Sequence, residues 1–203
     1  MSLPDGSNTY GEIIIDNDGL DGLATALNGV GWTATTRRSG FSGHSTLFIE
    51  RDDLAELETD TRGSRAHLCN GRVDVLLGAG LLQELSRSLR AFDVPHSFEL
   101  YQDDTTAVQT SVAWTHAGDR RCRVCGWASV HAPWGDDGCT PSGHRCPCCA
   151  AVWGKDDSTV ASARQFRRAW VAAGHPWHDP DQAEPPADLA VQLASVPELF
   201  ADL

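Results

Sequence analysis

The sequence predicts an α+β protein with two domains, a ferredoxin-like α/β sandwich in residues 1–117 and a smaller cysteine-rich domain in residues 118–203. Two observations support the first domain: its 117 residues can bury a core, and the pattern of strand, helix and two strands occurs in it twice. A third observation supports the second domain, because the composition changes at Ala117–Asp119, where the cysteine-rich stretch begins.

The first set of elements begins with the β-branched run Ile13–Ile15, which predicts a strand. Asp16–Asp18 can turn the chain and cap a helix, and Gly29 is suited to ending that helix. The buried face of this helix is marked by apolar residues at helical spacing, Leu20, Leu23 and Leu27. Two strands follow, Trp32–Thr36 and Leu47–Ile49, with a turn at Ser39–Gly43 between them.

Residues 51–71 are charged and poorly periodic, which predicts a long loop or a surface helix. The second set of elements then begins with a strand at Val73–Leu77 and continues with a helix that Pro95 ends. The apolar face of this helix consists of Leu82, Leu85, Leu89 and Phe92. A hairpin follows, with strands at His96–Tyr101 and Val108–Trp114 and a turn at Asp103–Thr105.

A further helix is predicted near the C-terminus. Asp157 or Ser158 can cap its start, and Gly174 with Pro176 ends it. Its apolar face consists of Val160, Ala163, Phe166, Trp170 and Ala173. The tail from Asp179 to Leu203 holds six acidic and no basic side chains.

The formal charge of the chain is −12, with 17 acidic and 8 basic side chains in residues 1–117 and 11 and 8 in residues 118–203. A field of this sign repels phosphate backbones and attracts basic proteins, so it argues against nucleic acid as the main partner. No apolar run approaches the 18 residues of a membrane span, and the first residues lack the basic and apolar stretches of a secretory signal. We therefore expect a cytoplasmic protein with no membrane partner.

Six of the seven cysteines lie between positions 122 and 149. In a reducing compartment such clustering favours metal ligation over disulfides. Two Cys-x-x-Cys pairs, Cys122 with Cys125 and Cys146 with Cys149, are separated by 20 residues, which is typical of a zinc ribbon. The sequence therefore predicts a zinc-ribbon-like lobe in which four thiolates bind a structural zinc ion, with Gly126 in the first tight turn.

Other ligand sets and another metal remain open at this stage. Cys139 and His144 could complete a mixed site with one pair, and Cys148 could replace Cys149. A tetrathiolate also accepts iron, which would make the chain a rubredoxin-like electron carrier.

The cysteine-rich stretch resembles the bacterial cysteine-rich CPCC proteins over about residues 120–195. The resemblance rests on Cys122-Arg-Val-Cys-Gly-Trp127, Pro133-Trp-Gly-Asp-Asp-Gly138, Pro141-Ser142, Cys146-Pro-Cys-Cys149 and Gly154-Lys-Asp-Asp157, and then on Trp170, Gly174, Trp177, Pro180 and Gln192-Leu193. It implies zinc binding, and for some members a place among toxin and immunity genes. This chain has Ala150 where the family usually has glycine, and Arg123 where proline is common. A left-handed turn at Ala150 would cost about 1 kcal/mol more than at glycine.

These observations predict a non-enzymatic, zinc-stabilised protein-interaction module, such as an immunity protein or antitoxin that binds a basic partner, for example a toxin. The alternative is a regulatory nucleic-acid-binding zinc ribbon, in which basic side chains beside the cysteines and on the last helix contact phosphates. That set consists of Arg120, Arg121, Arg123, Arg145, Arg164, Arg167 and Arg168. We identify no catalytic residues, because Gly40-Phe-Ser-Gly-His-Ser45 lacks the spacing of a nucleophile elbow.

Overall fold

A computed structural model describes residues 7–16, 18–40, 44–52, 54–62, 65–74, 76–101, 108–181 and 188–202. The chain divides into two compact units, Met1–Val112 and Ala113–Leu203. The sequence places this boundary slightly later, at the change in composition. The boundary falls inside the last strand of the sheet, and Trp114 at the end of that strand donates a hydrogen bond of 3.0 Å from its indole Nε1 to the Asp137 carbonyl of the second unit.

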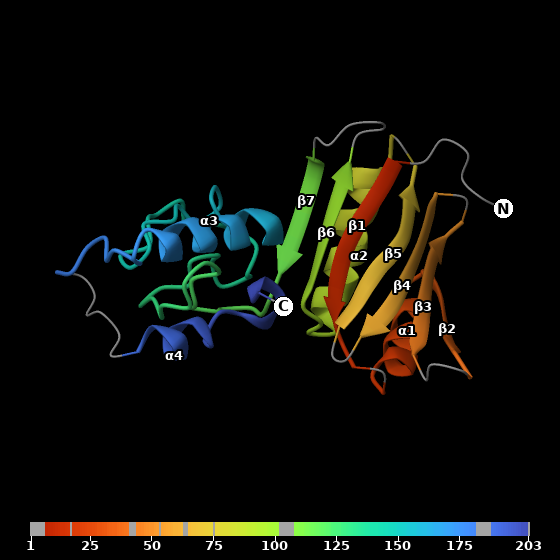
Figure 1. The fold of residues 1–203 in the computed structure, drawn as a ribbon. Helices are drawn as coiled ribbons and strands as arrows, with labels where there is room; N and C mark the ends of the chain where they lie inside the picture. The colour runs from red at the N-terminus through yellow and green to blue at the C-terminus, as the bar shows by residue number, and fades with distance from the viewer. Residues whose placement is uncertain are drawn as a thin grey trace. The chain divides into compact units, whose positions relative to one another are not determined.

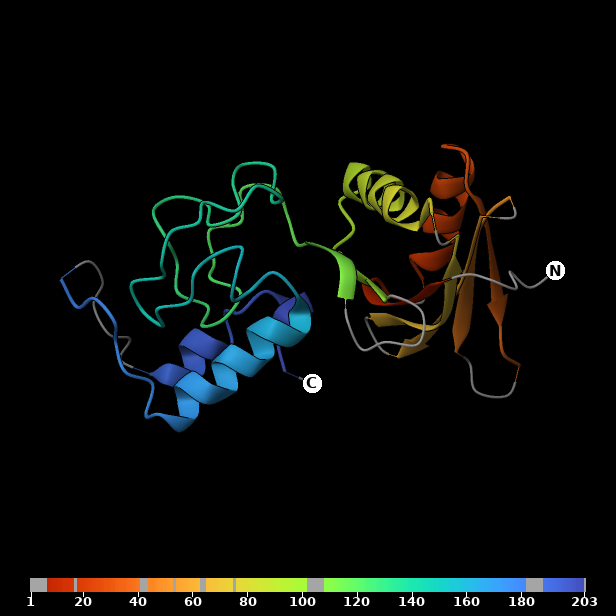
Figure 2. The ribbon, with the colours of Figure 1, turned by 90° about the horizontal axis from the view of Figure 1, so that it is seen from above.

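The main feature of the N-terminal unit is an antiparallel sheet with two helices on one face (Figures 1 and 2). The strand order is β2-β3-β4-β5-β1-β6-β7, and α1 and α2 cover the same side of the sheet. The elements are β1 (Ser7–Ile14), α1 (Leu20–Asn28), β2 (Thr33–Arg38), β3 (Ser45–Arg51), β4 (Ala55–Arg62), β5 (Arg65–Val73), α2 (Gly78–Ala91), β6 (His96–Tyr101) and β7 (Val108–Trp114).

The core of this unit lies between the helices and the sheet, as the apolar periodicity predicts. Inward-facing strand residues meet the leucines of both helices, and all of these side chains are buried. They include Ile13, Leu47, Ile49, Leu57, Phe98 and Leu100 from the strands, and Leu20, Leu23, Leu27, Leu82, Leu85 and Leu89 from the helices. The α+β class predicted from the sequence is therefore confirmed.

The prediction of a loop or surface helix over residues 51–71 is wrong, because this stretch forms most of β4 and β5. In β4 two of the inward-facing residues are Thr59 and Thr61, so the alternation lacks an apolar signal. The Thr61 hydroxyl, buried here, donates a hydrogen bond of 2.6 Å to the Ser45 carbonyl. With these two strands the sheet has seven strands, and the predicted ferredoxin-like arrangement is not confirmed.

The strand predicted at Val73–Leu77 is also wrong beyond its first residue, because β5 ends at Val73. The Asp74 carboxylate accepts hydrogen bonds from the backbone of Leu76 and Leu77 at 2.9 and 2.8 Å, and this turn starts α2. Asp16 makes a similar turn before α1, where it accepts from Gly19 N at 2.8 Å. The predicted turn at Asp103–Thr105 and residues 41–43 of the predicted turn at Ser39–Gly43 lie outside the described residues.

The C-terminal unit has less regular structure, with α3 (Val160–Ala172), α4 (Leu189–Leu193) and the short 3-10 helix η1 (Glu198–Phe200). In the view of Figure 1 its irregular loops lie between α3 and α4. The residue that caps α3 is Thr159 and not Asp157 or Ser158, because Thr159 and Ser162 form a reciprocal capping box. None of the helices in the described part of the chain has the length and apolarity needed to cross a bilayer.

A buried histidine in the N-terminal unit makes its stability depend on pH. His96 is fully buried, with its Nδ1 2.8 Å from the Val94 carbonyl and its Nε2 2.7 Å from the Ser86 hydroxyl. Burial, reinforced by the nearby charge of Arg90, lowers the pKa of His96 from 6.5 to about 4, against a raising effect of the bond to Val94. The folded state therefore holds a neutral imidazole at neutral pH.

We predict that this unit loses stability as the pH falls from about 6.5 to about 4. The unfolded chain takes up a proton at the ordinary pKa, so the stabilisation is complete above that value and is lost below it. At 1.36 kcal/mol for each pKa unit, the loss is about 3 kcal/mol. Urea unfolding followed by hydrogen exchange of the β1 and β6 amides measures it. His96→Gln should flatten this pH dependence, and His44→Gln at an exposed site should not. Equal slopes in all three proteins would contradict the prediction.

Candidate metal centre

Two tight turns of the C-terminal unit have the same backbone geometry, and each carries one Cys-x-x-Cys pair. In the first knuckle, Cys122–Gly126, Gly126 N donates to the Cys122 carbonyl at 2.9 Å. In the second knuckle, Cys146–Ala150, Ala150 N donates to the Cys146 carbonyl at the same distance, 2.9 Å. An isolated antiparallel bridge flanks each knuckle, Arg121 with Ala128 and Arg145 with Val152. The regular strands of a zinc ribbon are not confirmed.

The turns aim four sulfur atoms at one point. The Sγ atoms of Cys122, Cys125, Cys146 and Cys149 all lie within 4.8 Å of one another. The pair Cys122 and Cys149 is 3.8 Å apart, and the pair Cys125 and Cys146 is 3.7 Å apart. A tetrahedron with metal–sulfur bonds of about 2.3 Å has edges of about 3.8 Å. The spacing therefore fits a metal ion held by four thiolates, and it is these four cysteines that the sequence predicts as ligands.

The cluster is closed to solvent, since none of its four cysteines is more than 2% exposed. Burial raises the pKa of Cys122, but hydrogen bonds from the other three thiols and from Trp153 outweigh it and hold that pKa well below its usual value. Burial raises the pKa of Cys125, and the bond to Cys122 raises that of Cys149. A divalent cation at the centre would offset the cost of ionising all four thiols together.

The alternative ligands lie outside this group of four. Cys139 is half-buried and His144 is exposed. Cys148 is buried beside the cluster, and its sulfur accepts a hydrogen bond of 3.2 Å from the Gln192 side-chain amide. The same amide donates to the Cys125 carbonyl at 2.9 Å, so α4 holds the first knuckle through one side chain. Gln192 belongs to the tail motif of the CPCC resemblance, but sequence reasoning gives it no role.

Two of the arginines assigned to nucleic-acid contact are internal. Arg123 is 2% exposed, and its guanidinium lies 3.6 Å from the centroid of the Trp134 ring and 4.7 Å from that of Phe200. Its Nη2 donates hydrogen bonds of 3.3 Å to the carbonyls of Ala113 and Gly138. Burial lowers the pKa of Arg123 to about 10, which still leaves the side chain charged at neutral pH.

Arg167 is 4% exposed and joins α3 to the first knuckle and to the C-terminal segment. It donates to the carbonyls of Val124 at 2.6 Å, Arg123 at 2.9 Å and Phe200 at 2.8 Å, and to the Asp202 carboxylate at 2.8 Å. The assignment of Arg123 and Arg167 to a nucleic-acid surface is therefore wrong, because neither side chain can reach a phosphate.

The other arginines predicted to contact nucleic acid lie nearer the surface, and some donate hydrogen bonds to backbone carbonyls of the same unit. Arg120, Arg121, Arg145 and Arg168 are exposed, and Arg164 is half-buried. Arg121 donates to the Ser195 carbonyl at 3.1 Å, Arg145 to Ala150 at 2.9 Å, and Arg164 to Leu199 at 3.3 Å.

Comparison with known proteins gives no relative for this chain. No protein-family model matches it, and no curated protein and no solved structure is significantly similar to it. The site geometry is therefore the basis for the function proposed below.

The equivalent positions that end the two knuckles should respond in opposite ways to substitution. Ala150 has φ +67°, so Ala150→Gly should relieve the left-handed strain and stabilise the C-terminal unit by about 1 kcal/mol. Gly126 has φ +75°, and a Cβ there would lie 2.3 Å from the Gln192 carbonyl oxygen and 2.9 Å from Val196 N. Gly126→Ala should therefore destabilise the unit by about 3 kcal/mol.

Urea unfolding of the metal-loaded proteins, followed by tryptophan fluorescence, measures both changes. Ala128→Gly, at an exposed position beside the first knuckle, is the control for adding a glycine. If Ala150→Gly destabilises the unit as much as Ala128→Gly does, the backbone at Ala150 is not strained and the prediction is wrong.

Proposed function

We propose that this chain is a non-enzymatic protein-interaction module whose C-terminal unit folds around a structural zinc ion. The observation that carries the proposal is the closed cluster of four buried thiols at tetrahedral spacing. Four protein sulfurs fill the coordination sphere of zinc and leave no position for water, whereas catalytic zinc sites keep one position open. The ion would then order the unit and take no part in a reaction.

The need for a metal also follows from how little regular structure surrounds the cluster. Between Thr115 and Thr159 the described chain has turns and two isolated bridges, and no helix or extended strand. Lobes of this kind gain much of their folding free energy from metal binding, about 10–16 kcal/mol for zinc-finger peptides. Zinc is the common metal of structural sites with four cysteine ligands, and iron is the alternative that the same four sulfurs would accept.

The charge of the chain supports a basic protein as the partner. The net charge is −12, and β4 places Glu56, Glu58 and Asp60 on the face of the sheet opposite the core. Glu50 of β3 is exposed and pairs in register with Glu56. Such a field accelerates encounter with a basic surface and repels nucleic acid. An immunity protein or antitoxin that binds a basic toxin fits this chemistry, and the cytoplasm fits reduced thiols.

We predict one zinc ion for each chain, measured by elemental analysis after purification from a medium that contains both zinc and iron. Cys146→Ala should lose the metal and unfold the C-terminal unit, because a three-sulfur site is open and weak. Cys139→Ala is the matched control, since this half-buried cysteine is outside the cluster.

Hydrogen exchange of the α3 amides reports the folding of the C-terminal unit in each variant. Stoichiometric iron with the visible colour of an iron thiolate would overturn the assignment of zinc. A Cys146→Ala protein that stays folded without metal would overturn the structural role of the ion.

We predict that the partner captured by the full chain at low ionic strength is a basic protein, identified by mass spectrometry. With that partner purified, neutralising Glu56, Glu58 and Asp60 to Gln, Gln and Asn should slow association about tenfold at low salt and have little effect at high salt. Asp179→Asn with Asp181→Asn, in the acidic tail, is the matched control.

The nucleic-acid alternative gives a different result. In that case generic RNA or DNA would bind with a steep salt dependence, and Arg120→Glu with Arg168→Glu would abolish binding. Such a result would overturn the proposed function.

A further inference from the structure

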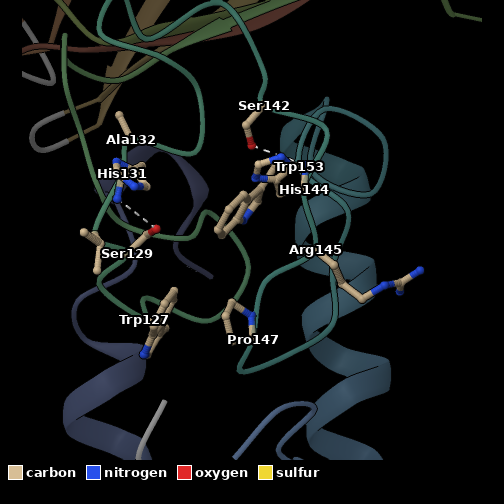
Figure 3. Close-up of a pocket in the computed structure, with 10 residues that line it drawn as sticks. Trp127, Ser129, His131, Ala132, Ser142, His144, Arg145, Pro147 and Trp153 are labelled. Atoms are coloured by element: carbon tan, nitrogen blue, oxygen red, sulfur yellow. Dashed lines mark hydrogen bonds between the residues drawn. The ribbon is translucent and has the colours of Figure 1, made fainter. Parts of the chain in front are cut away.

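A cavity opens in the C-terminal unit beside the two knuckles (Figure 3). Its walls come from the loop that follows the first knuckle, residues 127–132, and from residues 142–147, which lead into the second. Trp153 completes the lining. The volume is about 710 Å³, which lies within the range of small-molecule sites, about 300–1,000 Å³.

The sulfur cluster fixes one of the two tryptophans of this lining. Trp153 is 5% exposed, and its Nε1 donates a hydrogen bond of 3.5 Å to the Cys122 sulfur. The carbonyl of Trp127 accepts a bond of 3.0 Å from Cys122 N. The first bond fixes the indole of Trp153, and the second fixes the backbone of Trp127, beside which Pro147 of the second knuckle lies (Figure 3). The half-buried indole of Trp127 is suited to packing against a planar ligand ring.

Two equivalent turns supply the polar groups. In Ser129-Val-His131 the serine hydroxyl accepts from His131 N at 3.3 Å, and in Ser142-Gly-His144 the serine accepts from His144 N, also at 3.3 Å. Both bonds are drawn in Figure 3. Each turn therefore presents a hydroxyl hydrogen and an imidazole at the cavity, and both groups can donate hydrogen bonds.

The lining does not share the acidic character of the whole chain. Among the described residues that line the cavity there is no acidic side chain, although the chain carries a net charge of −12. Arg145 adds a positive charge at the rim. Its guanidinium is held by the Ala150 carbonyl and points away from the other lining side chains in Figure 3, so its stem forms the wall. A lining with hydrogen-bond donors and no carboxylate admits an anion without like-charge repulsion.

We propose that this cavity binds a small aromatic anion, with its planar ring against Trp127 and its carboxylate or phosphate group at the two Ser-x-His turns. The inference does not depend on the identity of the protein partner. It assigns a binding role to His131 and His144, which the metal cluster does not use.

Titration of the full-length, metal-loaded protein tests the proposal. The two anionic probes are adenosine 5′-monophosphate and indole-3-acetate, which separate a nucleotide phosphate from an aromatic carboxylate, and adenosine and indole are their neutral counterparts. At least one anion should bind with a dissociation constant between about 10 µM and 1 mM, and about tenfold more tightly than its neutral counterpart. The indole N–H resonance of Trp127 should shift during that titration.

Variants locate the binding to the two turns. His131→Ala and His144→Ala, at exposed positions, should each weaken binding of the anion about tenfold and leave the neutral counterpart little changed. His178→Ala, an exposed histidine outside the cavity, is the matched control and should leave both unchanged. The inference is overturned if neither anion binds below about 1 mM, or if the His131→Ala, His144→Ala double variant binds as tightly as the parent protein.

Discussion

The arrangement of the C-terminal unit depends on one constraint, the approach of four buried sulfur atoms to within 4.8 Å of one another. Neutral thiols at that distance share hydrogen bonds, but four thiolates repel one another unless a cation lies between them. The two Cys-x-x-Cys pairs, separated by 20 residues in sequence, supply two sulfurs each through nearly identical turns. A unit with so few regular elements can therefore be organised from its centre, with the helices packed around the knuckles.

Buried arginines connect that centre to the rest of the unit. Arg167 of α3 donates to backbone carbonyls of the first knuckle and of η1, and Arg123 lies between the rings of Trp134 and Phe200. The charged groups thus replace part of an apolar core, at a desolvation cost that hydrogen bonds and aromatic contacts offset. The same burial removes both side chains from the surface, where they would otherwise have supported contact with nucleic acid.

In the C-terminal unit, the buried sulfur cluster and the open cavity are separate sites. The sulfur cluster is buried, and Trp153 forms a boundary between it and the neighbouring cavity, with its indole N–H on Cys122. A bound metal would stiffen the cavity wall and remain closed to the ligand. In the N-terminal unit, Glu56 and Asp60 of β4 lie in register with Arg72 and His67 of β5, on the face of the sheet opposite the core. The proposed metal, ligand and protein binding depend on different residues and can be tested one at a time.

The sequence by itself determined the features that depend on neighbours in the chain. Helical periodicity predicted α1, α2 and α3, and the Cys-x-x-Cys spacing predicted which sulfurs come together. Only the tertiary structure decided that residues 55–62 form a strand, because Thr59 and Thr61 face inward and give no apolar signal. It also decided that Arg123 and Arg167 are internal and that Cys149, rather than Cys148, joins the cluster. The physical reason is that burial and the meeting of remote side chains depend on long-range packing, whereas turn and helix geometry are encoded in a few adjacent residues.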